Sequence, residues 1–301
     1  MPPNSVAVLG AGLTGLSSAY HLSRQFPKSK ITLLEKQLRL GGWVQTERKE
    51  IKKLSASILL EGGPRTLRPN GKSVLELVSN EVPPRSVLTE KSQINLLRLE
   101  DNVIVIPKTA PPAKARYLYI PKSYGTEPSG MQRIPSSIMS LLFSPLLPVM
   151  LPPVLLEPFK KANRNLKIGD ESVDSFFTRR FGATFARTFG SALVHGIYAA
   201  DSRKLSVRAA FPAIIDAEQR GMGSMVRGML VPNKKKAEEP YELGKIEEMM
   251  RGVSVYSFRD GMETLTRALE AALRAAPNVE ILPGTHISSL ALSRNHEIEA
   301  R

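Results

Sequence analysis

Three observations predict an α/β fold with a helical region inserted into it. A strand, a glycine-rich turn, a helix and a second strand follow one another between Ser5 and Glu35. Apolar and helix-like segments fill the middle of the chain, and strand and helix patterns return after residue 249. With 301 residues and 42% hydrophobic side chains, the chain is long enough for one large domain or two closely associated ones.

The first element is a strand over Ser5–Leu9, so near the start that no N-terminal targeting peptide is visible. The turn GAGLTG follows, then LSSAYHLSRQF with helical apolar spacing, and then the strand ITLLE, which ends in Glu35. Strand, turn, helix, strand and acid stand in the order of a Rossmann-like dinucleotide-binding unit. A GxGxxG motif alone can be a plain turn, but the full order favours nucleotide binding.

Each glycine of this turn has a physical role. Gly10 permits the tight turn, Gly12 lets a pyrophosphate approach the backbone, and Gly15 lets the helix pack against the strand. The helix N-terminus faces the phosphates, and Glu35 accepts hydrogen bonds from an unphosphorylated ribose. The predicted cofactor contacts here are Gly10, Ala11, Gly12, Leu13, Thr14 and Gly15, with Glu35 and Lys36 after the second strand.

Two more backbone-exposing turns follow and suit a flat flavin ring. The first contains Gly41, Gly42 and Trp43, although an ordinary Gly-Gly loop would look the same. The second comes after a short strand, and its predicted contacts are Gly63, Pro64, Arg65 and Thr66. Since the sequence has no cysteine, redox chemistry must come from a cofactor.

Several blocks of the sequence resemble the flavin amine oxidase superfamily and, within it, the protoporphyrinogen oxidases. The N-terminal blocks are GAGLTGLSSAYHLSR, LLEKQLRLGGWVQT and EGGPRTLRP; the later ones are ARYLYI, HGIYAADSRKLSVRAAFPAIIDAEQ and FRDGMETLTRALE. The block from GIYA to AEQ is the least generic of these. Together they span most of residues 4 to 292.

The resemblance implies an FAD enzyme of haem biosynthesis at the mitochondrial inner membrane. FAD would oxidise protoporphyrinogen IX to protoporphyrin IX, with molecular oxygen as acceptor and hydrogen peroxide as product. No protein nucleophile, carboxylate pair or catalytic triad is needed, so no catalytic residue is predicted. A homodimer is one assembly that the resemblance allows.

The resemblance also suggests substrate contacts. Arg116 would pair with a propionate, although a plain surface arginine is the alternative. Gly196 and Tyr198 would line the substrate cavity. A strand near Ile287 would reach the adenine side of FAD.

Residues 134–156 form a 23-residue segment without a charged side chain. Five prolines interrupt it, which favours short broken helices over one spanning helix. Basic residues, beginning with Lys160 and Lys161, follow directly, as in a segment that dips into one leaflet of a membrane. The resemblance places a membrane-binding region here; the alternative is a buried, proline-rich core loop.

Residues 172–230 read as successive helices. His195 lies in one of them on an apolar face, where a core or cavity-wall histidine is more common than a catalytic base. The other histidines have no partners at metal-binding spacing, so no metal site is predicted.

The positive charge is concentrated in the first half of the chain. The net charge is +14; residues 1–150 carry 20 basic and 10 acidic side chains, an excess of +10, and the remainder contributes +4. No nucleic-acid motif or interleaved aromatic pattern accompanies this charge, so we expect an anionic ligand and a membrane surface as partners and no nucleic acid.

The expected organisation has four parts. Residues 1–90 form the Rossmann-like FAD-binding part, 91–230 the substrate and helical membrane-binding region, 231–248 a solvated loop, and 249–301 an incomplete return to the FAD-binding part. Because enzymes of this group run to about 450 residues or more, with a C-terminal glycine-rich segment closing the FAD site, the chain looks truncated. Another flavin oxidase or desaturase, and a non-catalytic fragment, therefore remain alternatives.

Overall fold

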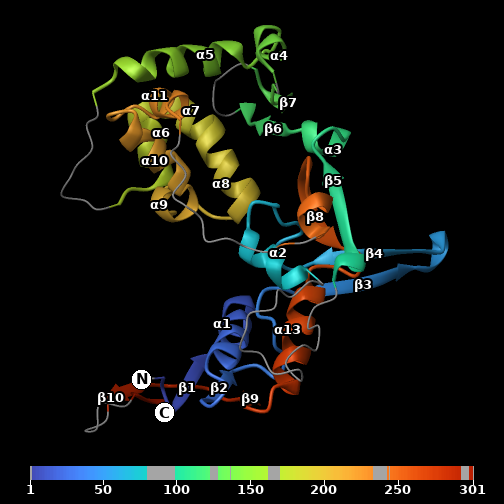
Figure 1. Cartoon of the computed structure of the whole chain (residues 1–301). Helices are drawn as coiled ribbons and strands as arrows, with labels where there is room; N and C mark the ends of the chain where they lie inside the picture. Colours follow the sequence, from blue (N-terminus) through green and yellow to red (C-terminus); the bar gives the residue numbers. More distant parts are fainter. Residues whose placement is uncertain are drawn as a thin grey trace. The chain divides into compact units, whose positions relative to one another are not determined.

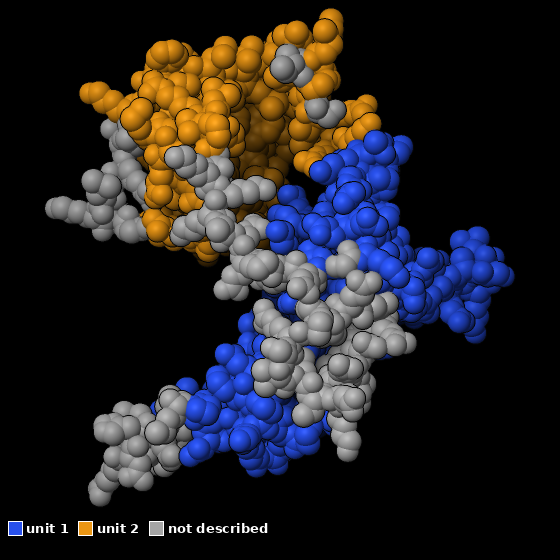
Figure 2. Space-filling view, viewed as in Figure 1, with its two compact units in different colours: residues 1–113, 239–301 blue, residues 114–238 orange. Residues whose placement is uncertain are grey.

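The computed structural model describes residues 2–79, 99–122, 128–135, 137–161, 170–232, 243, 245–292 and 298–300. The chain divides into two compact units, which Figure 2 colours separately. Unit 1 comprises residues 1–113 and 239–301, and unit 2 comprises residues 114–238. The segment expected to be a solvated loop, 231–248, lies largely outside the described residues.

Unit 1 is built around a parallel sheet of three strands in the order β1 (Ser5–Leu9), β2 (Lys30–Glu35) and β9 (Val279–Pro283). The register pairs Val6 with Ile31 and Ile31 with Val279. Both predicted N-terminal strands are confirmed, the second with one added residue. Within the described chain, β1 lies at an edge of this sheet.

Two helices of 13 residues pack side by side in this unit, α1 (Leu13–Gln25) and α13 (Glu263–Ala275) (Figure 1). Their apolar residues recur at helical spacing, and Leu16, Leu269 and Leu273 are fully buried with Ile31 and Leu33 of the sheet. The first glycine turn joins β1 to α1, and both elements pack in this core.

Shorter elements complete unit 1. The antiparallel ribbon of β3 (Thr46–Ile51) and β4 (Ala56–Glu61) turns through a 3₁₀ segment at Lys52–Leu54 (Figure 1). A second antiparallel pair joins β5 (Val103–Pro107) to β8 (Val253–Phe258). The remaining elements are α2 (Lys72–Val78), a 3₁₀ turn at Glu100–Asn102, α12 (Lys245–Met249), β10 (Leu290–Leu292) and β11 (Ile298–Ala300), with α3 (Pro111–Lys114) at the boundary between units.

Unit 2 begins with a short antiparallel hairpin and the uncharged segment. The hairpin consists of β6 (Tyr117–Ile120) and β7 (Gly130–Arg133). The uncharged segment forms α4 (Ile138–Leu142) and α5 (Leu147–Leu156), and a 3₁₀ turn, Glu157–Phe159, follows. The prediction of short broken helices is therefore confirmed, and no described helix is both long and apolar enough to cross a membrane.

The rest of unit 2 is helical, as the sequence predicts. The elements in order are α6 (Val173–Phe181), α7 (Ala183–Phe185), a π-helical turn (Ala186–Gly190), α8 (Ser191–Tyr198), α9 (Val207–Ala210), α10 (Pro212–Arg220) and α11 (Met225–Leu230). Phenylalanines at helical spacing contact one another in the core: Phe181 stacks on Phe185, and the ring of Phe177 is tilted against both.

A fully buried ion pair connects the turn after α5 to this core. Arg180 Nε donates to Glu157 Oε1 at 2.6 Å, and both side chains are inaccessible to solvent. The same carboxylate accepts hydrogen bonds from the Ser224 hydroxyl and from the amides of Met225 and Val226 at the start of α11. Because a buried carboxylate is costly without partners, these four donors hold the 3₁₀ turn at Glu157–Phe159, α6 and α11 together.

One predicted strand is wrong. Ile287 lies in an irregular segment between β9, which ends at Pro283, and β10, which begins at Leu290. The amide of Gly284 donates to the Gln37 carbonyl and that of Thr285 to the Glu35 carbonyl. Gly284 has a positive φ of 72°, so the chain leaves the sheet here instead of continuing it.

Candidate flavin site

The first glycine turn has the backbone geometry that the motif requires. Gly10 has φ +90°, in the region that favours glycine, and a Cβ on Gly15 would overlap the Gly10 carbonyl oxygen. Gly12 precedes α1 with an extended backbone, and no atom lies within 4 Å of where its Cβ would be. Gly10 and Gly15 therefore shape the turn, and Gly12 leaves open space beside the N-terminus of α1.

Glu35 is directly linked to this turn. Its Oε2 accepts a hydrogen bond from the amide of Ala11 at 2.6 Å, and its Oε1 accepts one from the amide of Gln37 at 2.9 Å. The carboxylate is half-buried at the end of β2, whereas Lys36 is exposed. A carboxylate has further lone pairs, so it can accept ribose hydroxyls from this position.

The second glycine loop packs against the first. The Gly41 amide donates to the Ala11 carbonyl at 2.8 Å, and Gly12 and Gly41 form an isolated parallel bridge. A Cβ on Gly42 would lie 3.0 Å from the Gly12 Cα. Gly41 and Gly42 both have positive φ, so this is no ordinary exposed loop: it is a close backbone contact between two turns 30 residues apart, from 12 to 42.

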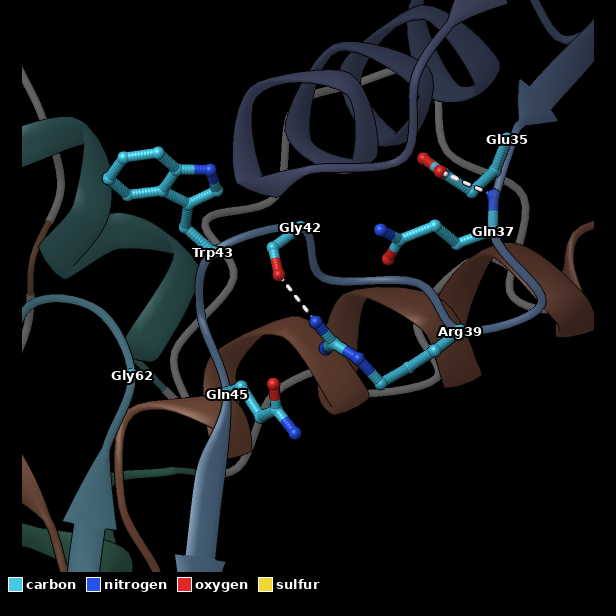
Figure 3. A pocket seen from close by; sticks show the side chains of 7 residues that line it. All are labelled: Glu35, Gln37, Arg39, Gly42, Trp43, Gln45 and Gly62. Carbon is cyan, nitrogen blue, oxygen red and sulfur yellow. Dashed lines mark hydrogen bonds between the residues drawn. The ribbon is translucent and has the colours of Figure 1, made fainter. Parts of the chain in front are cut away.

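Arg39 holds the second loop in place, a role that the sequence analysis missed. Its guanidinium donates to the carbonyls of Leu40, Val44 and Gly42, and Figure 3 shows the last of these bonds. One planar side chain thereby satisfies three backbone acceptors of the loop it precedes. The motif RLGG offered a signal, since an arginine next to a glycine pair can reach the carbonyls that the turn exposes.

The third turn lies beside the second. A Cβ on Gly63 would stand 2.6 Å from the Trp43 carbonyl, and the Gly62 amide donates to the Gln45 carbonyl. The indole of Trp43 is 87% exposed and points away from Arg39 (Figure 3). Pro64, Arg65 and Thr66 are exposed, and the Arg65 carbonyl accepts from the Ser257 hydroxyl at 2.9 Å.

Hydrogen bonds of Glu61 and Thr46 connect the base of the β3–β4 ribbon to the start of α13. The sequence did not predict this second group of contacts. Glu61 accepts from the Thr46 hydroxyl at 2.8 Å and from the Met262 amide at 3.0 Å. Thr46 in turn accepts from the Glu263 amide at 3.2 Å. Gly261 is required here because a Cβ would stand 2.6 Å from Glu61 Oε1. These contacts join segments about 200 residues apart, which no local pattern signals.

A cavity of about 430 Å³ opens beside these loops. Its lining residues, drawn in Figure 3, are Glu35, Gln37, Arg39, Gly42, Trp43, Gln45 and Gly62. The open space at Gly12, the half-buried carboxylate of Glu35 and this cavity fit the adenosine and pyrophosphate of a dinucleotide. Ile287 follows the segment whose amides donate to the carbonyls of Glu35 and Gln37.

The predicted substrate residues all lie in unit 2. Arg116 is exposed just before β6, and its carbonyl accepts from the Ile134 amide at 2.8 Å. Gly196 and Tyr198 are exposed on α8, where the Tyr198 hydroxyl donates to the Ala210 carbonyl at 2.8 Å. His195 is exposed too, so it is not a core histidine, and its place in a cavity wall stays a prediction; among the residues of α8 only Val194 is buried.

Among the residues that the structure describes, no group of three or more His, Asp or Glu side chains could hold a metal ion.

The fold and the packed glycine loops define a flavoprotein of the amine oxidase type. The sequence profile described as flavin containing amine oxidoreductase matches residues 13–298, and the chain belongs to this family. The fold is shared by a crystal structure from Exiguobacterium sp. 255-15, with a TM-score of 0.60 and 20% identity over all of this chain and 57% of that one.

Among curated relatives, the chain is 33% identical to a Schizosaccharomyces pombe protein named protoporphyrinogen oxidase, over 92% of this chain and 56% of that protein. It is 27% identical to a Staphylococcus aureus protein named coproporphyrinogen III oxidase, over 86% of this chain and 50% of that protein. The chain therefore spans about half the length of the relatives it matches. The flavin-containing family agrees with the predicted FAD cofactor.

Proposed function

We propose that the protein takes part in the FAD-dependent oxidation of protoporphyrinogen IX to protoporphyrin IX in haem biosynthesis. Molecular oxygen would be the acceptor and hydrogen peroxide the product. The observation that carries the proposal is the contact between the glycine turn at Gly12 and the loop at Gly41, with the Glu35 carboxylate beside them. Relatives named for oxidation of porphyrinogens support the choice of substrate class.

The residues of unit 1 have defined tasks in this proposal. The open backbone at Gly12 and the N-terminus of α1 bind the pyrophosphate, and Glu35 accepts from the ribose. Arg39 keeps the loop carbonyls turned away from the cofactor by occupying them, and the Glu61–Thr46 contacts fix the adjoining ribbon to α13. FAD, when bound, supplies the two-electron oxidation, so no side chain has to act as a nucleophile.

Arg116 neutralises one propionate of the substrate in this proposal. A guanidinium suits the task because it binds a carboxylate through two parallel hydrogen bonds. The alternative of a plain surface arginine predicts that Arg116→Ala leaves the Michaelis constant unchanged. The proposal expects that constant to rise about five- to ten-fold with the FAD content intact.

We also propose that unit 2 docks on a membrane surface, the mitochondrial inner membrane in a eukaryotic cell. No residue of α5 is buried, and Phe143 and Phe159 at either end of it are 84% and 82% exposed. Exposed Lys160 follows directly, so anionic headgroups would meet a cation next to the apolar side chains. Among the described residues of 134–156, only Leu146 is fully buried, and Ile134, Met150 and Val154 are partly buried against apolar clusters, so a buried core loop fits only part of the segment.

One experiment separates the candidate functions. The purified chain is loaded with FAD, its flavin absorbance is recorded, and porphyrin fluorescence and peroxide are followed after protoporphyrinogen IX is added in air. Porphyrin formed above the rate of a flavin-only control supports the proposal. Bound flavin without porphyrin formation contradicts it and favours another flavin oxidase, which amine and carotenoid substrates would then test. A chain that holds no flavin favours a non-catalytic role, and light scattering on the same sample reports whether a homodimer forms.

A further inference from the structure

The sequence contains a single Asn-Gly pair, Asn70-Gly71, which lies in an exposed turn of unit 1 just before α2. Pro69 and Asn70 are the turn residues, and the amide nitrogen of Gly71 lies 3.5 Å from the carbonyl oxygen of Arg68. That distance is at the outer limit for a hydrogen bond, so the Gly71 amide is held only weakly. Within the described residues, the exposed side chain of Asn70 makes no hydrogen bond.

The backbone at position 71 does not require glycine. The φ angle of Gly71 is −86°, a negative value that other residues adopt freely. A Cβ on this residue would meet only the Val74 Cγ2 atom, at 3.8 Å, which is an ordinary van der Waals distance. Gly10 and Gly15 differ, because Gly10 has a positive φ and Gly15 has no room for a Cβ. The missing side chain at position 71 leaves the backbone amide unshielded next to the Asn70 side chain.

Asn278, in the same unit, shows the opposite arrangement. Its Nδ2 atom donates to the carbonyls of Ser23, Phe26 and Ser29, at 3.2, 3.2 and 3.1 Å. The residue that follows it, Val279, is β-branched and begins strand β9. The side-chain amide of Asn278 is therefore fixed by the fold, and the backbone amide after it is shielded.

We propose that Asn70 is a site of spontaneous deamidation in the folded protein. The Gly71 amide nitrogen, once it has lost its proton to hydroxide, attacks Cγ of Asn70 and closes a succinimide ring. The bond from Cγ to Nδ2 breaks, and that nitrogen takes up protons from water and leaves as ammonia. Water then adds to either ring carbonyl, which opens the ring to aspartate or to isoaspartate. The reaction consumes only water and does not depend on the proposed function.

The two products affect the chain before α2 differently. Aspartate adds a negative charge and keeps the backbone, whereas isoaspartate also lengthens the main chain by one carbon atom. The chain has little slack on either side of the turn. The amides of Leu67 and Tyr256 donate to one another's carbonyls, at 2.8 and 2.9 Å, and Leu75 and Val78 of α2 are buried. The isoaspartyl form should therefore be less stable than the unmodified chain.

The test incubates the full chain and follows the conversion of asparagine to acid by peptide mass mapping. Chromatography of the peptides separates aspartate from isoaspartate. We expect conversion at Asn70 and none at Asn278 over the same time. The rate should rise from pH 6 to pH 8, since the attacking nitrogen must first lose its proton. Thermal unfolding should show that the aged chain is less stable than the fresh one.

Gly71→Ala is the decisive variant, because its Cβ fits the folded structure. Conversion at Asn70 should be about ten-fold slower in this variant, since a Cβ shields the attacking amide and restricts the backbone angles that ring closure needs. Gly196→Ala, on α8, is the matched control and should convert at Asn70 as fast as the wild type does. Asn70→Gln should also resist conversion at position 70, because its longer side chain closes a less favourable ring.

Three results would overturn the inference. The first is conversion of Asn70 in the urea-unfolded chain but not in the folded chain, because the fold would then protect the residue. The second is conversion in Gly71→Ala at the rate of the wild type, and the third is equal conversion of Asn278 and Asn70 in the folded chain. Thermal unfolding verifies that Gly71→Ala folds; if it does not, Asn70→Gln decides, and conversion there at the wild-type rate would reject the proposal.

Discussion

The carboxylate of Glu35 accepts a hydrogen bond from the amide of Ala11 across 24 residues of chain, at 2.6 Å. The acid at the end of β2 is thus a neighbour of the turn that begins α1. One side chain at this position can both orient the turn and accept hydrogen bonds from a ribose.

Replacing Glu35 should therefore reduce FAD affinity. We expect Glu35→Ala to weaken FAD binding about ten-fold or more, because hydrogen bonds to a charged group are among the stronger ones. Glu35→Gln keeps one acceptor, so its affinity for FAD should lie between those of the wild type and of Glu35→Ala. Quenching of flavin fluorescence on titration measures both. Glu50→Gln, an exposed residue of β3, is the control; an equal loss in Glu50→Gln and Glu35→Gln would argue against a specific role.

The absence of a side chain at position 15 should contribute to the stability of the fold. Gly15→Ala would drive a methyl group into the Gly10 carbonyl, so β1 or α1 must shift, and we expect a loss of about 2 kcal/mol or more in the free energy of unfolding. Gly196→Ala on α8 is the matched control, because nothing lies within 4 Å of its Cβ. It should be neutral or stabilising by up to about 1 kcal/mol. Urea denaturation compares the two, and equal effects would contradict the packing argument.

The buried Glu157 should make the stability of unit 2 depend on pH. Burial alone would raise the pKa of Glu157, but hydrogen bonds from Ser224, Arg180 and the Met225 and Val226 amides outweigh it, and the pKa is lowered. A lowered folded-state pKa stabilises the fold above the unfolded value of 4.5 and ceases to do so as the pH falls through the folded value.

We expect Glu157→Gln to cost about 3 kcal/mol at pH 7, since it leaves Arg180 buried without a counter-charge. Urea unfolding at pH 7 and below pH 4.5 should show the difference between variant and wild type shrinking with acidification. A difference independent of pH would mean that the charge of Glu157 contributes nothing.

Membrane docking should depend on the phenylalanines beside α5. Phe143→Asp and Phe159→Asp should each reduce binding to vesicles containing anionic lipid about 30-fold, as burying a phenylalanine contributes about 2 kcal/mol. Leu38→Asp, 85% exposed in unit 1, is the control and should sediment with vesicles as the wild type does. Unchanged sedimentation of both phenylalanine variants would reject this docking surface.

The hydroxyl of Tyr256 should be dispensable for stability. This side chain on β8 is fully buried, its hydroxyl has no partner among the described residues, and burial raises its pKa to about 12. Tyr256→Phe should therefore be as stable as the wild type or slightly more so. Above pH 10 the wild type should lose stability because the unfolded tyrosine ionises first, and the variant should lose less. Denaturation at pH 8 and pH 11 checks both statements.

Local patterns were sufficient to predict the first strand, the glycine turn and the acid of unit 1, and the broken helices of unit 2. The strand over Ser5–Leu9, the turn and the acid at Glu35 follow from residue spacing within one short stretch, and the broken helices of residues 134–156 follow from their prolines. Arg39 could have been identified from its place before Gly41, because the carbonyls it binds are all within five residues.

Other features depend on contacts that no window of sequence contains. Glu61 meets Met262 about 200 residues away, so its role appears only when β4 and α13 come together. Near Ile287, the resemblance suggests a strand, but backbone hydrogen bonds from Gly284 and Thr285 to the end of β2 bend the chain away from the sheet. The apolar residues around His195 suggest a buried helix face, but α8 has only Val194 buried and exposes the face that carries His195.

The hydrogen bond between the Gly41 amide and the Ala11 carbonyl also allows the separation of the two glycine loops to be measured by hydrogen exchange. The Gly41 amide is occupied by the Ala11 carbonyl, so its hydrogen can exchange with solvent only when the loops separate. The exchange rate of that single amide reports how often the loop opens. A ligand that bridges both loops should slow it, even where the folded structure itself does not change.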